Sequence, residues 1–303
     1  MSALPADEPL PFDPFRPAPG GRYADERLVV VRRRPMHLVG RERWVGRTTH
    51  FGIGRDGGRL LVVHGLGAVS VSADVAADIA SELFAPGWVV GADAFERLVA
   101  GVVLTAHEDP ATAWEAFYRN SLARIDDGTD RSGFAPVYRR AEALVAEAGA
   151  GSVLDLGSCF GFGPLRIADG VAGPVADIVA CDVAPGTMRL LDLMGRRLGT
   201  PVRTITADAA AVPVPDRSAD VVTCVHLLEH VDAAHGARIL AEACRIARRR
   251  VVVAVPVEEV ADATFGHVRT LTSADLLAAA RPLTGWQAAT LEENGAWLVL
   301  DRR

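Results

Sequence analysis

The sequence predicts an α/β protein. An open parallel sheet with helices on both faces should end in an antiparallel C-terminal hairpin and follow a smaller β-rich and helical region. Beyond residue 131, short β-branched runs alternate with helical patterns, as in a parallel sheet. The stretch Glu293-Asn294-Gly295 separates two apolar runs and is typical of a hairpin turn. Hydrophobic residues make up 50% and charged residues 23% of the 303 residues, which is enough apolar material for a full core.

The first 72 residues divide into a leader and a small sheet. Residues 1–21 contain six prolines and predict an extended arm. Residues 22–72 predict an antiparallel sheet, because their apolar β-branched runs are interrupted by Arg55-Asp56-Gly57-Gly58, a hairpin signal. The predicted strands are residues 28–31, 44–53, 60–64 and 68–71.

Three helices are expected after this sheet. Ser72-Ala73-Asp74 is typical of a helix cap, and the first helix should continue to about Phe84. Two further helical patterns occupy about 92–106 and 110–125. The turn-rich stretch 126–130 predicts a domain boundary. The chain is therefore divided into a leader at 1–21, an accessory domain at 22–130 and a larger α/β domain at 131–303.

In the larger domain, helices and strands alternate until the final hairpin. The predicted helices are residues 134–148, 161–169, 186–198, 235–247 and 273–280. The predicted strands are residues 152–156, 177–182, 202–206, 220–224, 250–255, 287–291 and 296–300. This order predicts that the carboxyl ends of the parallel strands meet at one edge of the sheet, where such folds bind ligands.

The charge distribution, the N-terminal sequence and the cysteines indicate which partners and which cellular location to expect. The chain has no lysine, and residues 22–59 hold ten arginines against four acids, whereas residues 60–303 are acidic. The acidic larger domain argues against a nucleic-acid partner. The N-terminus lacks a basic and apolar signal, and no apolar run approaches the ~20 residues that span a bilayer, so we expect a cytoplasmic protein without a membrane span. The four cysteines form no Cys-x-x-Cys pair and are expected to be buried thiols; they are Cys159, Cys181, Cys224 and Cys244.

A glycine-rich turn follows the first strand of the larger domain. The stretch runs from Asp155 through Gly157 and Ser158 to Gly161 and opens a helix. Glycines let the backbone approach a ligand closely, and a helix N-terminus presents free N–H groups to ligand oxygens. The alternative is a tight strand–helix turn in which the glycines serve packing alone.

Two further acids follow the next two strands. Asp182 ends the second strand, where a carboxylate can accept both hydroxyls of a ribose; alternatively it caps the following helix. Asp208 follows the third strand, where an acid can accept a hydrogen bond from an adenine amino group; alternatively it is a turn residue. Three acids on successive strand ends are more specific evidence of a ligand site than any one of them.

These motifs distinguish between cofactors. A nicotinamide dinucleotide site usually has Gly-x-Gly directly at the strand end, whereas here Asp155 comes first and Asp208 adds a second acid after the third strand. At this point residues 131–303 resemble the class I S-adenosylmethionine-dependent methyltransferases, including their late-strand signature at 219–231. The resemblance implies a Rossmann-like sheet and S-adenosylmethionine as cofactor. One position departs from the family, which usually has glycine where Cys159 stands.

The resemblance also implies roles for the residues at the strand ends. It places Asp155, Gly157, Ser158 and Gly161 around the methionine part of the cofactor. It places Asp182 and Val183 at the ribose, Asp208 and Ala209 at the adenine, and the start of the substrate side at Val225.

The stretch His226-Leu227-Leu228-Glu229-His230 is the expected centre of the chemistry. A hydroxyl is a poor nucleophile until a base begins to remove its proton, and a histidine can do this near neutral pH. His230 is the first choice for that base, with Glu229 as its orienting partner and His226 and His267 as the other candidates. Related enzymes sometimes bind a divalent metal such as Mg²⁺ at a Glu-His pair, which here would be Glu229 and His230. Such sites usually carry another Glu where this chain has His226, and the alternative is that the pair only orients the loop.

Two arginine-bearing stretches lie near these histidines in the sequence. His267 and Arg269 follow the fifth strand; alternatively they are a surface histidine and an arginine paired with Glu258 or Glu259. Residues 248–250 are three consecutive arginines at the base of a strand and predict a solvated charge run opposite the site.

The N-terminal region adds a narrower resemblance. Residues 12–17, 31–40 and 44–51, together with 157–162, are similar to the methyltransferase of the mycofactocin system. This resemblance implies O-methylation of a glucose in the oligosaccharide of that redox cofactor. Two alternatives stay open: a methyltransferase on another small-molecule acceptor, or a non-catalytic cofactor-binding scaffold.

The small N-terminal sheet is expected to shape the acceptor site. Residues 22–72 combine the excess of arginine with the aromatic residues Tyr23, Trp44 and Phe51, which suit a sugar or an acidic group. The alternative is a module for stability or dimerisation.

Overall fold

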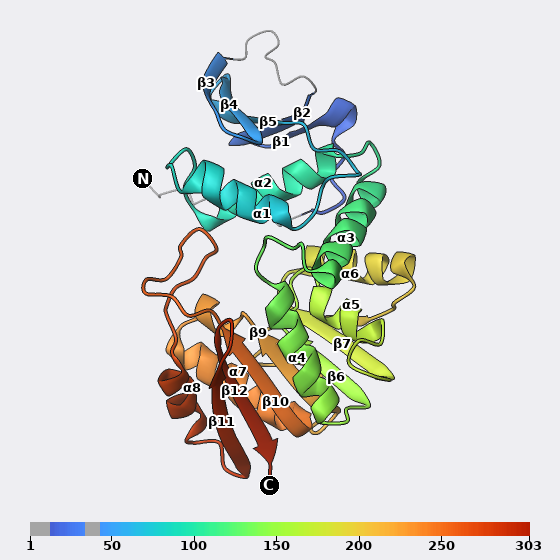
Figure 1. The fold of residues 1–303 in the computed structure, drawn as a ribbon, viewed down its shortest axis with the longest axis vertical. Coiled ribbons are helices and arrows are strands. Elements are labelled where there is room, and N and C mark those ends of the chain that lie inside the picture. The colour runs from blue at the N-terminus through green and yellow to red at the C-terminus, as the bar shows by residue number, and fades with distance from the viewer. Residues whose placement is uncertain (1–12, 34–42) are drawn as a thin grey trace, which may run out of the picture.

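A computed structural model of the chain describes residues 13–33 and 43–303. Most of the leader, 1–12, and the stretch 34–42 with part of the narrower resemblance lie outside the described residues. Figure 1 shows the N-terminal sheet at the top, a helical layer beneath it, and the larger α/β sheet below. Within the described residues, no helix is both long and apolar enough to cross a membrane.

The N-terminal sheet is mixed, and the prediction of a purely antiparallel sheet was wrong. A short helix, η1 (Pro19–Gly21), leads into five strands: β1 (Arg22–Ala24), β2 (Leu28–Arg32), β3 (Arg43–Arg47), β4 (Phe51–Asp56) and β5 (Arg59–His64). Their order is β1-β2-β5-β4-β3. The predicted hairpin between β4 and β5 is confirmed, but β2 pairs with β5 in parallel.

Three local predictions in this region need correction. The run 44–53 is two strands, because the chain turns at Thr48, whose hydroxyl accepts from the Phe51 amide. Residues 68–71 form a turn, since the Val71 amide donates to the Gly67 carbonyl. No side chain caps the first helix, because its N-cap residue is Ala73. Asp74 is instead an acceptor for the backbone amide of Arg131.

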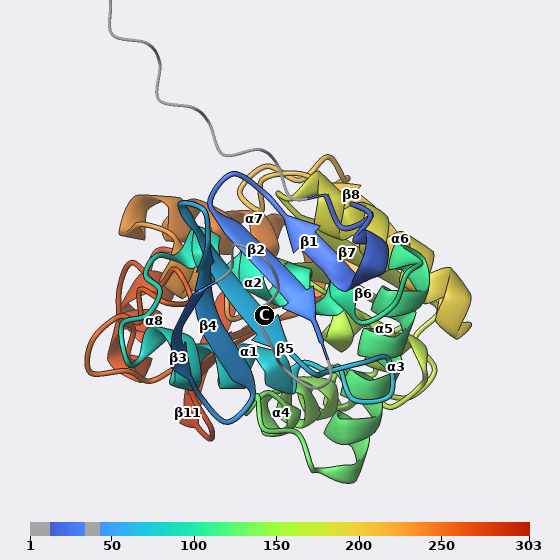
Figure 2. The ribbon, with the colours of Figure 1, turned by 90° about the horizontal axis from the view of Figure 1, so that it is seen from above.

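The helical layer contains the predicted helices. It comprises α1 (Asp74–Ile79), the π-helical turn η2 (Ala80–Phe84), α2 (Ala92–Thr105) and α3 (Pro110–Asp127). The Asp109 side chain caps α3, Pro110 occupies its first turn, and Gly128 ends it in a left-handed conformation. Figure 2 shows the small sheet lying over α1 and α2, so these helices separate it from the larger sheet.

The larger sheet has seven strands in the order β11-β12-β10-β9-β6-β7-β8. They are β6 (Ser152–Leu156), β7 (Asp177–Asp182), β8 (Arg203–Thr206), β9 (Ala219–Val225), β10 (Ala247–Val255), β11 (Trp286–Glu292) and β12 (Ala296–Arg302). β12 pairs antiparallel with both β10 and β11. The other pairings are parallel, so the predicted parallel sheet with its antiparallel hairpin is confirmed.

Helices cover both faces of this sheet, as predicted. One face carries α4 (Ala135–Glu147), α5 (Phe162–Ala168) and α6 (Pro185–Leu198); the other carries α7 (Ala233–Ile246) and α8 (Ser273–Ala280). Alternate residues of a strand point to opposite faces. In β6, accordingly, Val153 packs with α4–α6 and Leu154 packs with α7 and α8.

The accessory region shares a core with the larger domain. Leu98 of α2 and Phe117 of α3 belong to the same buried cluster as Phe162 and Leu165 of α5. The Tyr118 hydroxyl in α3 donates to the backbone carbonyl of Phe160, 2.7 Å away. These contacts hold the helical layer over the carboxyl ends of the parallel strands (Figure 1).

Candidate functional site

Asp155 stands at the end of β6, nearly buried between two strands. One carboxylate oxygen accepts from the Thr223 hydroxyl of β9 at 2.6 Å. Desolvation, together with a smaller effect of the neighbouring Asp182 carboxylate, raises the pKa of Asp155 to about 6. A carboxylate in such a place gains from a cationic ligand, such as an ammonium group, because the ligand would offset the lost hydration.

The glycine-rich turn folds tightly against two leucines. Gly157 and Gly161 have φ of +72° and +71°. A β-carbon at Gly157 would lie 2.8 Å from Leu227, and one at Gly161 would lie 2.4 Å from Leu191. The positive φ and these close contacts both disfavour a larger residue, so packing by itself gives a reason for each glycine. The same turn also lies at the ligand-binding edge of the sheet, so the two interpretations of the motif are compatible.

Cys159, where the resemblance implies a glycine, has a left-handed backbone conformation. Its φ is +47°, and its backbone amide donates to an oxygen of Asp182 at 2.9 Å. The prediction of four buried thiols was wrong for Cys159, which is exposed, whereas the other three cysteines are buried. All four thiols are free.

Asp182 and Asp208 lie at the ends of β7 and β8, where the sequence predicted them. The second oxygen of Asp182 accepts from the Ala184 amide at 2.9 Å, so the carboxylate is held by two backbone donors. Val183 beside it is 72% exposed and free to contact a ligand. The pKa of Asp208 is lowered, first by the backbone amide of Ala210 and then by other contacts including His235.

Two residues at this edge were not predicted from the sequence. His235 on α7 places Nε2 2.8 Å from an oxygen of Asp208. Glu96 on α2 lies close enough to Asp182 for the two carboxylates to interact; desolvation first, then Asp93 and Asp182, raise the pKa of Glu96. No sequence pattern marked Glu96, because only the tertiary fold brings α2 to this edge.

The N-terminal strands do not face this edge, contrary to expectation. Tyr23 and Phe51 are buried in the core, and Trp44 lies on β3, beyond the helical layer. Phe95 of α2 instead contacts Phe265 in the loop after β10, with ring centroids 5.1 Å apart. Among the described residues, the helical layer, and not the strands of the small sheet, contacts the loop after β10.

His226 and Glu229 form a pair just beyond β9. His226 Nδ1 lies 3.2 Å from Glu229 Oε1. The histidine has φ of +53° and its amide donates to the Ala254 carbonyl. Among the described residues, His226 Nε2 and both oxygens of Glu229 are buried without a hydrogen-bond partner. Buried polar atoms without partners are rare, and they are a sign of a ligand site.

His230 and His267 face each other beside this pair. Their ring centroids are 4.9 Å apart, and His267 Nδ1 lies 2.9 Å from both oxygens of Glu258. Desolvation lowers the pKa of His230, against the opposing charge of Glu229. Arg269 donates to the Leu228 carbonyl. The alternative prediction, a surface histidine with Arg269 paired to Glu258 or Glu259, is therefore not what the structure has: the His267 side chain is largely buried and contacts Glu258 itself.

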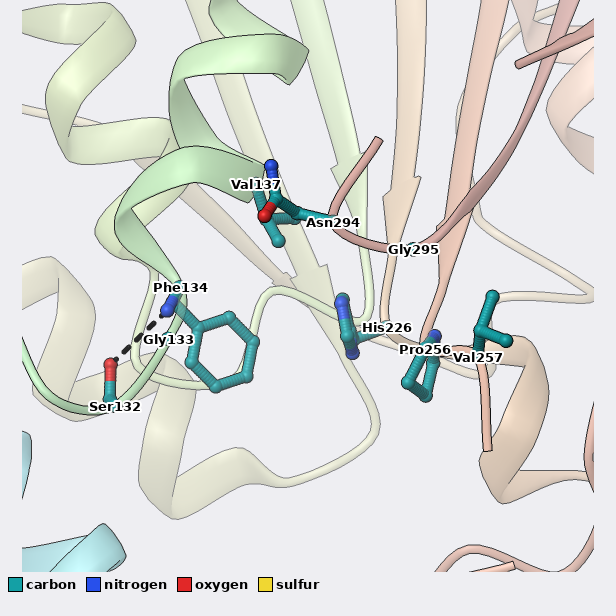
Figure 3. Close-up of a pocket in the computed structure, with 9 residues that line it drawn as sticks. All are labelled: Ser132, Gly133, Phe134, Val137, His226, Pro256, Val257, Asn294 and Gly295. Carbon is teal, nitrogen blue, oxygen red and sulfur yellow. Dashed lines mark hydrogen bonds between the residues drawn. The ribbon is translucent and has the colours of Figure 1, made fainter. Parts of the chain in front are cut away.

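A pocket of about 260 Å³ lies on the other side of His226. Figure 3 shows His226 between Phe134 on one side and Pro256 and Val257 on the other. The His226 and Phe134 rings meet edge to face, with centroids 5.1 Å apart. The complete lining is Ser132, Gly133, Phe134, Val137, His226, Pro256, Val257, Asn294 and Gly295.

The three arginines 248–250 lie opposite the site, as predicted; Arg248 and Arg249 are exposed and Arg250 is half-buried, and all three also make hydrogen bonds to the protein. Arg248 donates to Asp220 and to two backbone carbonyls, Arg249 donates to the carbonyls at the end of α4, and Arg250 pairs with Asp301. They close the amino-terminal edge of the sheet, opposite the candidate site.

Comparisons with known proteins bear on this fold and site. Residues 154–255 match the profile of the family described as "Methyltransferase domain". A search of the curated proteins gave no match. Among solved structures, the chain is similar to magnesium protoporphyrin IX methyltransferase from Synechocystis PCC 6803 with bound SAM, at 17% identity and a TM-score of 0.46 over 57% of this chain and 81% of that one. A SAM-dependent methyltransferase from Aquifex aeolicus is similar at 16% identity and a TM-score of 0.45, over 60% of this chain and 97% of that one.

The matched segment contains the three strand-end acids and the pair at 229–230. With the Rossmann-like sheet described above, the match supports a class I S-adenosylmethionine-dependent methyltransferase, here with an additional N-terminal β-rich region. The match to a methyltransferase domain agrees with S-adenosylmethionine, the cofactor that the resemblance implies.

Proposed function

We propose that the protein is an O-methyltransferase that methylates a hydroxyl of a small glycosylated molecule. The observation that carries this proposal is the His226–Glu229 pair. A buried carboxylate lies 3.2 Å from Nδ1 of the histidine, whose Nε2 has no hydrogen-bond partner among the described residues. The two groups form no hydrogen bond in this structure, but a carboxylate this close to an imidazole stabilises its protonated form by charge attraction, so the imidazole can take a proton.

His226 fits the role of general base better than His230, the first choice from the sequence. The carboxylate of Glu229 is close to the ring of His226, while the ring of His230 faces His267. His226 also lines the pocket. In our proposal, Glu229 is a positioning residue and His226 is the residue that touches the acceptor.

The pocket suits one sugar unit. Its volume of about 260 Å³ is slightly below the ~300–1,000 Å³ of most small-molecule sites, so it would hold a single ring and leave the rest of an oligosaccharide outside. Phe134 and Val137 offer an apolar face, and Ser132 and Asn294 offer polar groups to hydroxyls.

The proposed reaction is an in-line displacement at the methyl carbon of the cofactor. The acceptor oxygen forms a bond to that carbon as its proton passes to Nε2 of His226. The carbon–sulfur bond breaks, and its electron pair neutralises the sulfonium, which gives S-adenosylhomocysteine. Asp155, Asp182 and Asp208 are proposed to hold the methionine, ribose and adenine parts of the cofactor.

For the acceptor itself, we propose a glucose of the mycofactocin oligosaccharide. The support is the resemblance of residues 12–17 and 31–40 to the methyltransferase of that system, together with a pocket of single-ring size. Another small-molecule acceptor is the second candidate. The same base could deprotonate a hydroxyl of either acceptor, so an experiment has to distinguish the two.

The test supplies isotope-labelled S-adenosylmethionine to the purified chain with a panel of glucosides and oligoglucosides. We expect mass spectrometry to find one labelled methyl group on a sugar oxygen. His226→Gln should lower the turnover number by ~10²–10⁴-fold while S-adenosylhomocysteine still binds. The matched control is His107→Gln, before α3 and away from the site. Full turnover by the His226 variant, or methylation of nitrogen or carbon only, would refute the proposal.

A further inference from the structure

The glycine-rich turn at residues 157–161 contains three residues in the left-handed conformation. Gly157, Cys159 and Gly161 have φ of +72°, +47° and +71°. Glycine adopts this conformation readily, but the β-carbon of a cysteine disfavours it. A side chain in such a conformation persists only where the surrounding structure holds it there. Contacts from outside the turn must therefore stabilise the backbone at Cys159.

Helix α3 supplies such contacts through the next residue, Phe160. The hydroxyl of Tyr118 donates to the Phe160 carbonyl at 2.7 Å, and Tyr118 is fully buried. The Phe160 ring lies against Trp114 and Phe117 of the same helix, with both centroid distances at 5.6 Å. Side chains of α3 thus hold Phe160 by a hydrogen bond and by ring contacts.

The other side of the turn contacts the carboxylate that is proposed to bind the ribose. The Cys159 amide donates to one oxygen of Asp182 at 2.9 Å, and the Ala184 amide donates to the other. The direction of the Cys159 amide depends on the conformation of the turn. A continuous series of contacts therefore runs from Tyr118 through Phe160 and Cys159 to Asp182.

We propose that Tyr118 is a positioning residue for the cofactor, because it holds the turn in the conformation in which Asp182 can bind. The accessory region thereby sets the cofactor affinity of the larger domain. The proposal also accounts for Cys159, since a turn supported by α3 does not need the glycine that the resemblance implies there. The inference rests on the cofactor site of the proposed function, on which Tyr118 acts only through the turn.

Removal of one hydroxyl isolates this role. Tyr118→Phe keeps the ring and its packing, but the Phe160 carbonyl loses its donor. The turn then occupies its binding conformation for part of the time, and the dissociation constant rises by the inverse of that fraction. We expect the affinity for S-adenosylhomocysteine to fall ~3–10-fold, which corresponds to one net hydrogen bond. The KM for S-adenosylmethionine should rise, while the turnover number at saturating cofactor should change less than about twofold.

The experiment titrates the full chain and its variants with S-adenosylhomocysteine by calorimetry, and thermal unfolding reports that each variant is folded. The matched control is Ser121→Ala, because Ser121 is also buried and lies on the same helix. Its hydroxyl donates to the Phe117 carbonyl and accepts from the Ala73 amide, neither of which belongs to the turn. Both variants should unfold at a lower temperature than the natural chain, but only Tyr118→Phe should bind the ligand more weakly.

A second background tests the path through Cys159. In Cys159→Gly the left-handed conformation no longer needs support, so the addition of Tyr118→Phe should lower the affinity less than about twofold. An unchanged affinity in Tyr118→Phe alone, an equal loss in Ser121→Ala, or the same loss in the Cys159→Gly background would each overturn the proposal.

The binding assay separates this inference from the proposed reaction. A chain that binds S-adenosylhomocysteine but methylates no glycoside would refute the proposed function and leave the role of Tyr118 intact. A natural chain that does not bind S-adenosylhomocysteine would refute the cofactor site and this inference together.

Discussion

Replacement of Asp155 by asparagine should stabilise the ligand-free protein at alkaline pH and weaken cofactor binding. The change keeps the shape of the side chain and its acceptance of the Thr223 hydroxyl, and it removes a charge that burial disfavours. The proposed partner of that charge is the ammonium group of the cofactor. The same substitution should therefore lower the affinity for S-adenosylhomocysteine.

The magnitude follows from the pKa of Asp155, which rises from 3.8 to about 6 on folding. The folded state binds this proton more tightly than the unfolded state. The contribution of Asp155 to stability is therefore full below pH 3.8 and is lost as the pH rises through about 6. A shift of about two pKa values corresponds to about 3 kcal/mol, and relaxation around the charge reduces the expected gain to about 1–3 kcal/mol at pH 8. At pH 5 the gain should be roughly half as large.

Thermal unfolding of the ligand-free chain, followed by circular dichroism at pH 5 and pH 8, measures this difference. We expect Asp155→Asn to raise the melting temperature by a few degrees at pH 8 and by less at pH 5. Asp169→Asn, an exposed change at the end of α5, is the control and should leave the pH dependence unaltered. A variant that is no more stable than the natural chain at pH 8 would refute the reasoning.

Two further predictions concern residues at the carboxyl ends of β6 and β7. Asp182→Ala should weaken S-adenosylhomocysteine binding at least tenfold in a calorimetric titration, because charge-assisted hydrogen bonds to a ribose contribute ~1.5–3 kcal/mol each. Asp177→Ala, at the opposite end of β7, should leave this affinity unchanged. An equal loss of affinity in both variants would show that Asp182 does not hold the cofactor. Gly161→Ala should lower the free energy of unfolding by about 1–3 kcal/mol, since it adds a clash with Leu191 to the strain of a positive φ. The control is Gly149→Ala, because Gly149 also has a positive φ but has open space around it. In chemical denaturation, this variant should lose less free energy of unfolding than Gly161→Ala. An equal loss would show that the clash with Leu191 is unimportant.

The larger domain could be predicted well because its signals are local. Strands buried on both faces, such as β6 and β9, appear as largely apolar runs, and Gly151 and Gly157 flank β6. The boundaries of β7 and α8 agree with the prediction. The Asn294-Gly295 turn predicted the last hairpin, because that turn demands left-handed residues that few other pairs supply.

The small sheet and the details of the site depend on long-range packing. Nothing in the sequence of β2 indicates that it pairs in parallel with β5, because the same apolar strand could join either direction. The placement of Glu96 beside Asp182 likewise needs α2 to lie on the larger domain. The sequence brought His226, Glu229 and His230 together as a motif, but which ring faces the carboxylate depends on the left-handed turn at His226.

The contact between Gly161 and Leu191 restricts how related chains can diverge. The two residues lie on different elements, and a β-carbon at position 161 has no room while the leucine is present. A smaller residue at 191 would remove this clash, although the positive φ at 161 would still disfavour a side chain. The residues at these two positions should therefore vary together, and relatives with alanine at 161 should more often carry a small side chain at 191.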